Sequence, residues 1–397
     1  MIDKNLIDDG SIVESILREK YFSGKKFYED DGMKKYFQDI RKNYKYLCIF
    51  GAGIWGIFLG KWLSGYDVKV DYYCDNDKKK VGSIVNDAKV LSFEELVLIK
   101  NEVFVIVSAT NKERHYNEEI NQQIIDFPYI IPNILKIAAF FRDDYQLSFE
   151  NCLSSAKQFY FALSDERSKE LFLELLKVKF VSSAEAFAQN PLEKFYDPVQ
   201  YFAPCHYKNS KDAIIVDCGA FVGDSLLEYL DLFHNDFKEY HCFEMDPNVL
   251  PILKSNIDTL PEICKKKVYV HPCGVSDEEG YARLHLSTDT GGSSFQENGE
   301  CEVAISLLDQ QMRHKNVTMI KMDIEGAELK ALIGASELIK KNRPILAISI
   351  YHSMEQFFEI PVWILEHYPF YKMQLGLHTT ITDDTVLYAI PDNMPDI

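Results

Sequence analysis

Acidic residues and glycines follow apolar strands at the positions where a parallel sheet binds ligands. The apolar strand at 214–217 ends in Asp217, and the next strand ends in a second acid, Glu244. Between them lie a glycine loop and the start of an amphipathic helix, with Gly219, Ala220, Gly223, Asp224 and Ser225. Glycine lets backbone approach a ligand, and the first turn of a helix offers unpaired N–H groups. This order is typical of a nucleoside site, and an α/β turn that binds nothing is the alternative.

The form of the glycine loop indicates which nucleoside it holds. It reads DxGAxxG, without the GxGxxG motif that approaches a pyrophosphate, and this favours S-adenosylmethionine (SAM), which has no phosphate. We expect Asp217 to orient the methionine part of SAM through backbone or water. Glu244, with Met245 beside it, is expected to take the ribose hydroxyls. Cys273 and Gly274, after the third strand, are expected to border the adenine.

Three further residues have side chains suited to methyl transfer. An alcohol is a poor nucleophile, so its methylation needs a placed acceptor and a base or a metal. Asp323 ends one strand and His352 ends the next. Glu325 follows Asp323 at i+2, and on an extended segment this spacing points both carboxylates the same way. We expect Asp323 to act as base or organiser, Glu325 to contact the acceptor or a metal, and His352 to act as base. The alternatives are a helix cap for Glu325 and a structural hydrogen bond for His352.

Other polar residues are weaker candidates. His378 ranks below His352, as a structural or acceptor-binding residue. The Gly/Ser loop at 291–294 is suited to closing over a site, and a plain surface loop is equally expected. Cys205, His206 and Cys218 lack the spacing of metal ligands, so no metal site is predicted, although a divalent metal remains compatible with the chemistry.

An earlier strand also leads into a glycine loop. Gly51, Gly53 and Gly56 form a GxGxxG motif between a strand and a helix, and Asp75 ends the following strand. These positions suit a nucleotide, with Asp75 at the ribose. A fold of the same type kept only for packing or assembly is the alternative.

The succession of elements predicts an α/β protein with two Rossmann-like, doubly wound domains joined by a helical connector. We expect a helical segment at 1–40, a nucleotide-binding module at 41–135, the connector at 136–210 and the second domain at 211–397. Strands that alternate with helices indicate parallel sheets. Only a short turn separates the last two strands, so these are expected to be antiparallel.

Composition limits the partners of the chain. It has 397 residues, with 61 acidic against 43 basic side chains and a net charge of −18. This balance argues against a nucleic acid partner, because phosphate binding needs a basic face. The nine cysteines form no CxxC pattern, the first residues do not resemble a signal peptide, and no apolar run is long enough to span a bilayer. We therefore expect a cytoplasmic protein. The sequence is compatible with either a monomer or a homo-oligomer.

The second half of the chain resembles the FkbM family of SAM-dependent O-methyltransferases over about residues 201–391. Five segments carry the resemblance: VDCGAFVGDS at 216–225, FEMDP at 243–247, CGVSDEEG at 273–280, IKMDIEGAE at 320–328 and TVLYA at 385–389. The resemblance implies a seven-stranded class I SAM-binding sheet with an antiparallel seventh strand, and methyl transfer to a hydroxyl of a sugar or glycan precursor. The first module more weakly resembles nucleotide-binding domains found beside sugar-modifying transferases of surface polysaccharide pathways, through GAGIWG at 51–56 and YYCDNDKKKVG at 73–82.

Three functions compete at this stage. The first is an O-methyltransferase acting on a sugar, sugar nucleotide or glycan precursor. The second is an NAD(P)-dependent sugar oxidoreductase or epimerase using the Gly51 loop, against which stands the lack of a Tyr-x-x-x-Lys pair after that module. The third is a non-catalytic, nucleotide-binding interaction protein, against which stands the complete set of acids and glycines in the second domain.

Overall fold

The computed structural model describes nine segments of the chain, which are residues 9–22, 31–108, 118–130, 149–180, 192–203, 210–286, 293–295, 298–379 and 384–392. Contacts divide the chain into two compact units. The first unit is Met1–Leu153, Glu170–Tyr196 and Thr379–Thr382, and the second is Ser154–Lys169, Asp197–His378 and Asp383–Ile397. The predicted connector is thus shared between the units, and each unit is described by itself.

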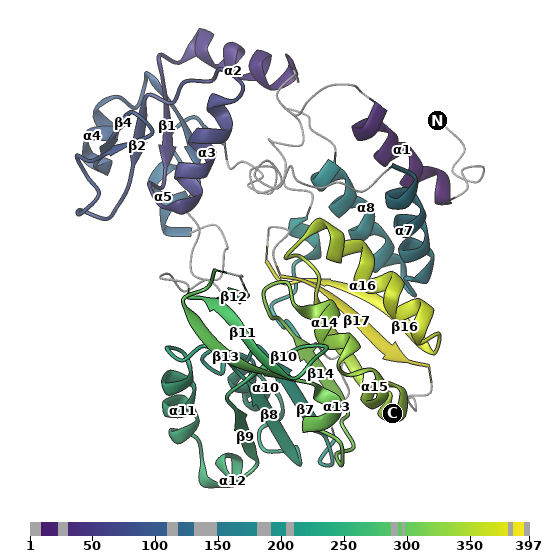
Figure 1. The fold of residues 1–397 in the computed structure, drawn as a ribbon. Coiled ribbons are helices and arrows are strands. Elements are labelled where there is room, and N and C mark those ends of the chain that lie inside the picture. The colour runs from purple at the N-terminus through teal and green to yellow at the C-terminus, as the bar shows by residue number, and fades with distance from the viewer. Residues whose placement is uncertain are drawn as a thin grey trace. The chain divides into compact units, whose positions relative to one another are not determined.

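The first unit contains a six-stranded sheet of order β3-β4-β2-β1-β5-β6. Strands β1, β2 and β4 of this sheet are labelled in Figure 1. All its pairs are parallel except β3 with β4. Its strands are β1 (Tyr46–Phe50), β2 (Tyr72–Cys74), β3 (Ile84–Val85), β4 (Ala88–Leu91), β5 (Val103–Val107) and β6 (Tyr129–Ile130). Its helices include α1 (Asp9–Phe22), α2 (Asp31–Asn43), α3 (Ile54–Ser64), α4 (Phe93–Leu98) and α5 (Glu118–Ile124). The predicted glycine loop joins β1 to α3.

The second unit contains a seven-stranded sheet of order β16-β17-β15-β14-β7-β8-β9. Its strands are β7 (Ile214–Cys218), β8 (Glu239–Phe243), β9 (Val268–His271), β14 (Met319–Met322), β15 (Ile345–Ser349), β16 (Tyr371–Leu377) and β17 (Thr385–Pro391). The first five of these are parallel, while β17 runs antiparallel to both β15 and β16. The seven-stranded sheet and the antiparallel final pair are therefore as predicted.

A smaller four-stranded sheet of order β10-β13-β11-β12 follows the third strand. Its strands are β10 (Gly274–Val275), β11 (Gly280–His285), β12 (Ser294–Phe295) and β13 (Cys301–Ser306). The remaining helices of the described residues are α7 (Phe149–Ala162), α8 (Glu166–Phe180), η2 (Glu193–Phe195), α10 (Asp224–Phe233), α11 (Leu250–Asp258), α12 (Glu262–Lys265), α13 (Leu308–Gln311), α14 (Glu328–Ile333), α15 (Ser336–Asn342) and α16 (Met354–His367).

The central strands of the large sheet are buried on both faces. Every residue of β7, β14 and β15 is buried, which explains why these strands read as nearly unbroken apolar runs. Two charged residues interrupt this pattern, Asp217 in β7 and Lys321 in β14, and they lie opposite each other in the parallel register. A buried charge requires a partner of opposite charge, so we expect these two residues to pair with each other at this end of the sheet.

No helix in the described part of the chain is long and apolar enough to cross a membrane.

The loop after β7 fits closely against the end of β14. Gly219 has φ +78°, and a Cβ added there would lie 2.0 Å from the carbonyl oxygen of Asp323. We expect Gly219→Ala to destabilise the second unit by on the order of 2 kcal/mol or more, because it adds both backbone strain and a collision with backbone. Gly280→Ala is the matched control, since Gly280 also has positive φ but no atom within 4 Å of the added Cβ. Urea denaturation checks the prediction, and equal losses in the two variants contradict it.

Candidate active site

Backbone hydrogen bonds join the glycine loop to the end of β8. The N–H groups of Gly219 and Ala220 both donate to the carbonyl oxygen of Phe243, each at 3.0 Å. Gly223 then adopts a left-handed conformation and precedes α10, whose first turn contains Asp224 and a buried Ser225. The loop therefore closes tightly at the carboxyl edge of the sheet, as the sequence predicts.

The carboxylate of Glu244 accepts three backbone N–H groups. Its donors are Phe221 at 2.9 Å, and Met245 and Asp246 at 2.8 Å each. Only 9% of the residue is exposed, and burial raises the pKa of Glu244 against the lowering effect of these hydrogen bonds. Glu244 thus lies between the glycine loop and the strand end, where the sequence predicts contact with the ribose, and that contact stays a prediction.

Asp217 and Lys321 form a buried ion pair beneath the loop. Their charged atoms are 2.9 Å apart, with side chains 0% and 3% exposed. Lys321 also donates to the carbonyl oxygen of Gly219 at 2.7 Å, and Tyr240 donates to Asp217 at 3.0 Å. Burial opposes the charge on Lys321, but the neighbouring carboxylates, Asp217 first, raise its pKa. Asp217 therefore acts on the loop through Lys321, and its predicted effect on a cofactor is indirect.

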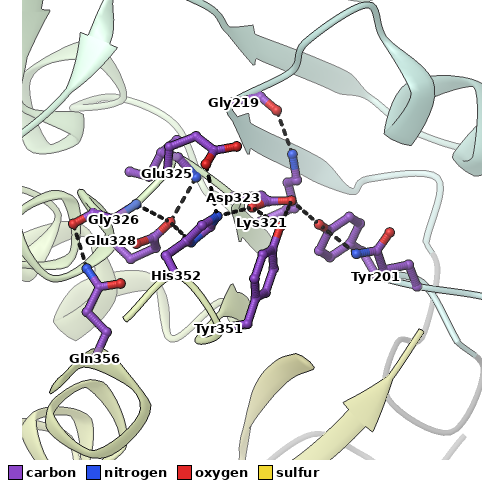
Figure 2. Close-up of polar contacts among 12 residues, drawn as sticks. Tyr201, Gly219, Lys321, Asp323, Glu325, Gly326, Glu328, Tyr351, His352 and Gln356 are labelled. Atoms are coloured by element: carbon purple, nitrogen blue, oxygen red, sulfur yellow. Dashed lines mark hydrogen bonds and ion pairs between the residues drawn. The ribbon is translucent and has the colours of Figure 1, made fainter. Parts of the chain in front are cut away.

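Asp323 follows β14 and receives hydrogen bonds from two tyrosines (Figure 2). Tyr201 donates to Asp323 at 2.8 Å and Tyr351 donates at 3.1 Å. Burial opposes ionisation of Asp323, yet the contact with the imidazole of His352 and the charge of Lys321 bring its pKa well below the ordinary value. Asp323 is therefore a firmly ionised carboxylate, which suits an organiser of charge better than a proton acceptor.

His352 lies among three carboxylates, as Figure 2 shows. Its Nε2 is 3.3 Å from Asp323 and 3.6 Å from Glu325, and its Nδ1 is 3.1 Å from Glu328. Burial lowers the pKa of His352, but the contacts with Asp323 and Glu328 outweigh it and raise the pKa to about 10. As a free side chain in this cluster, His352 is protonated at neutral pH, so its predicted role as a base would require a higher pH than that of an ordinary histidine.

The turn after Asp323 departs from the predicted extended backbone. Glu325 has φ +56° and Gly326 has φ +100°, so the segment turns sharply before α14. Glu328, not Glu325, holds this turn, because its Oε1 accepts the N–H of Ile324 at 2.9 Å. Glu325 therefore does not cap the helix, and its carboxylate lies 3.6 Å from Nε2 of His352.

The other predicted residues of the second unit lie nearby in different environments. Cys273 and Gly274 follow β9, and Gly274 begins the small sheet. His378 is structural in its contacts: its Nδ1 meets the carbonyl oxygen of Asp197 at 2.9 Å, so it carries the proton and donates there. Within the predicted closing loop, Ser293 donates to Asp246 at 2.5 Å. Gly291 and Gly292, like Cys205 and His206, lie outside the described residues.

In the first unit, the carboxylate of Asp75 is already engaged. It accepts the N–H of Ala52 at 2.8 Å and that of Asp77 at 2.9 Å, and it pairs with Lys80 at 3.0 Å. Asp75 and the Gly51 loop are thus brought together as predicted. Gly56 allows close packing, since a Cβ there would lie 1.8 Å from the carbonyl oxygen of Gly51. Whether Gly51, Gly53, Gly56 and Asp75 hold a nucleotide stays a prediction.

Sequence reasoning missed four residues of the site, which are Tyr201, Lys321, Glu328 and Tyr351. The sequence does contain a sign of the role of Lys321, because a lysine inside a strand that is otherwise apolar requires a buried acid as partner. Glu328 had a weaker one, as an acid in the first turn of a helix after a glycine turn. The two tyrosines had no chemical signal, since an aromatic residue near a strand end is more often part of a core.

Comparisons with known proteins find similarity to methyltransferases in this part of the chain. Residues 217–370 match the family described as the methyltransferase FkbM domain. A crystal structure of a methyltransferase FkbM from Methylobacillus flagellatus KT is similar over 96% of this chain and 100% of that chain, with 20% identity and a TM-score of 0.68. At this identity the likeness establishes the fold. No curated protein matches the sequence at a significant level.

Two other solved structures match only part of the fold. An rRNA methylase from Streptococcus thermophilus covers 46% of this chain and 89% of its own, with 15% identity and a TM-score of 0.30. Fibrillarin from Aeropyrum pernix, with natively bound S-adenosyl-L-methionine, covers 49% of this chain and 69% of its own, with 12% identity and a TM-score of 0.29. Scores below 0.5 carry no further conclusion for this chain.

The ion pairs of His352 predict a pH dependence of stability. Its pKa rises from 6.5 to about 10 on folding, so its stabilisation is complete below pH 6.5 and is lost as pH rises through about 10. With a chelator present, the free energy of unfolding should fall by on the order of 2 kcal/mol between pH 7 and 10. His352→Gln should remove much of this slope, and His314→Gln, at an exposed position, should keep it. Denaturant unfolding across this range is the measurement, and parallel profiles for wild type and His352→Gln refute the assignment.

Proposed function

We propose that the protein is a SAM-dependent O-methyltransferase whose acceptor is a hydroxyl of a sugar, a sugar nucleotide or a glycan precursor. One observation carries the proposal: the glycine loop packs directly on the backbone of Asp323. The predicted cofactor loop and the polar cluster around Asp323 therefore share one edge of the sheet. The FkbM match over residues 217–370 supports methyl transfer as the chemistry.

The residues at this edge fit the chemistry of SAM. Glu244 keeps lone pairs beyond the three N–H groups that it accepts, and these suit ribose hydroxyls. The carboxylates of Asp323, Glu325 and Glu328 outnumber the single imidazolium among them, which makes the cluster favourable for a positive charge. When bound, SAM supplies an electrophilic methyl group on a positively charged sulfur.

The polar cluster is suited to holding the acceptor. Asp323 is fixed by Tyr201 and Tyr351, which leaves it oriented and ionised. The Glu325 side chain is 38% exposed, so a carboxylate able to accept sugar hydroxyls borders the opening of the cluster. These features support an acceptor rich in hydroxyl groups, in agreement with the resemblance to sugar O-methyltransferases.

The alternative of a nicotinamide-dependent enzyme gains no support from the first unit. Lys80 and two backbone N–H groups occupy the Asp75 carboxylate, which would otherwise meet a ribose. We propose that this unit binds a nucleotide weakly or not at all and does not carry the chemistry.

Glu244→Gln should weaken SAM binding about 10- to 100-fold, because the neutral amide loses charge-assisted bonds to the ribose worth about 1.5–3 kcal/mol. Glu278→Gln, at an exposed position after β10, is the matched control and should bind SAM as wild type does. Calorimetric titration of each folded variant with SAM is the measurement. An unchanged affinity in Glu244→Gln removes the ribose assignment.

Asp323→Asn should lose most of the methyl transfer, on the order of 100-fold in the single-turnover rate, with SAM affinity changed much less. The reason is that the amide removes the one firmly ionised group that both tyrosines orient. Asp258→Asn, in an exposed ion pair with Lys265, should keep the wild-type rate. Intact mass of sugars and sugar nucleotides after incubation with SAM identifies the acceptor by a single methyl gain. A wild-type rate in Asp323→Asn, or methylation at an atom other than a hydroxyl oxygen, contradicts the proposal.

A further inference from the structure

Several polar atoms around His352 are buried without a hydrogen bond. Within the described residues, neither ring nitrogen of His352 nor Oε2 of Glu328 has a partner with hydrogen-bond geometry. The His352 side chain is 8% exposed and that of Glu328 is 0% exposed. The carboxylates of Asp323, Glu325 and Glu328 come within ion-pair distance of the ring nitrogens. Their oxygens do not lie in the directions that hydrogen bonds to these nitrogens require. Leaving buried polar atoms unsatisfied is unfavourable, so a group that satisfies them together would stabilise the protein.

The same atoms are spaced as the ligands of one ion. Asp323, Glu328 and His352 each offer an oxygen or nitrogen atom, and the three atoms lie within 4.8 Å of one another. Ligands of a single divalent cation at bond lengths of about 2.0–2.4 Å are separated by no more than roughly this distance. We propose that Asp323, Glu328 and His352 hold a divalent cation at the carboxyl edge of the seven-stranded sheet.

The surroundings hold these three ligands in place. Tyr201 and Tyr351 fix Asp323, and the N–H of Ile324 fixes Glu328. When Nδ1 of His352 binds the ion, its Nε2 faces Glu325, a carboxylate outside the proposed ligand set, at 3.6 Å. A carboxylate behind a ligating histidine fixes its tautomer and orientation, and this arrangement recurs at metal sites.

Exposure and donor types indicate how the ion is reached and which ions fit. The side chain of Glu328 is fully buried, at 0% exposure, while those of Asp323 and Glu325 are 22% and 38% exposed. The site is therefore open on one side, where water or a hydroxyl can complete the coordination. Two carboxylates with one imidazole suit Mn²⁺, Mg²⁺ or Zn²⁺ better than a thiophilic metal.

A cation at this position accounts for activation of the acceptor, and this consequence rests on the proposed function. With the cation bound, Asp323 and His352 serve as its ligands, so neither is free to take the proton of the acceptor. A cation would lower the pKa of a hydroxyl that approaches from the open side, as it does for water. The hydroxyl proton then passes to Glu325 and on to solvent, the oxygen–methyl bond forms, and the methyl–sulfur bond breaks with its electron pair left on sulfur.

Mn²⁺ is the probe for the test, because its electron spin reports both binding and ligands. The full chain is treated with chelator, dialysed and titrated with Mn²⁺ alone, without SAM or acceptor. We expect one bound Mn²⁺ per chain and an electron spin echo modulation from one directly bound histidine nitrogen. His352→Gln should abolish the nitrogen signal and weaken Mn²⁺ at least tenfold. Asp323→Asn should also weaken Mn²⁺ but retain the nitrogen signal at saturation. His314→Gln, at an exposed position, is the matched control and should behave as wild type.

The results separate this inference from the proposed function. Absence of binding at millimolar Mn²⁺, a bound ion without nitrogen coupling, or an unchanged signal in His352→Gln overturns the metal site. If a variant does not fold, the stoichiometry and nitrogen coupling of the wild type decide alone. SAM binding is titrated separately in the presence of a chelator. If SAM binds and Mn²⁺ does not, only the metal site fails. If Mn²⁺ binds with the nitrogen signal and SAM does not bind, the proposed function fails.

Discussion

The buried ion pair of Lys321 and Asp217 joins two neighbouring strands where both meet the site. The ammonium of Lys321 lies 2.9 Å from Asp217 and also donates to the carbonyl oxygen of Gly219. Removing one partner of such a pair leaves an uncompensated buried charge, at a cost of about 3–5 kcal/mol. The pair thereby fixes the backbone of the glycine loop, and with it the N–H of Phe221 that holds Glu244. The positions of the glycine loop and of Glu244 thus depend on a buried contact between protein groups.

Charge is distributed unequally on the two sides of this pair. Lys321 balances Asp217 beneath the loop, so the interior is close to neutral there. Beyond it, Asp323, Glu325 and Glu328 surround the single imidazole of His352. An excess of negative charge in a partly closed site favours cations, and it raises the free energy of the protein when none is bound. A sulfonium and a metal ion are both cations, so the same excess serves the proposed cofactor and the proposed metal.

The parts of this site that the sequence predicted are those encoded locally. The glycine loop, Glu244 and the adjacency of Asp323 and His352 follow from strands, turns and a parallel order, which short segments reveal. The hydrogen bond of Tyr201 to Asp323 joins residues 122 positions apart, and no local pattern announces it. The i, i+2 spacing of Asp323 and Glu325 predicts an extended segment, whereas the turn at Gly326 and the hydrogen bond from Ile324 to Glu328 impose a sharp reversal.

The two units place an acid in the same way but leave it in different states. In each, a carboxylate after the second strand of the motif accepts an N–H from the glycine loop: Asp75 from Ala52 and Glu244 from Phe221. Asp75 also pairs with Lys80, whereas within the described residues Glu244 has no ion pair. A carboxylate that is already neutralised gains little from ribose hydroxyls, while an unpaired one gains charge-assisted hydrogen bonds. The same local arrangement thus secures a loop in the first unit, and in the second it leaves a carboxylate that has no ion pair among the described residues, in agreement with the proposed function.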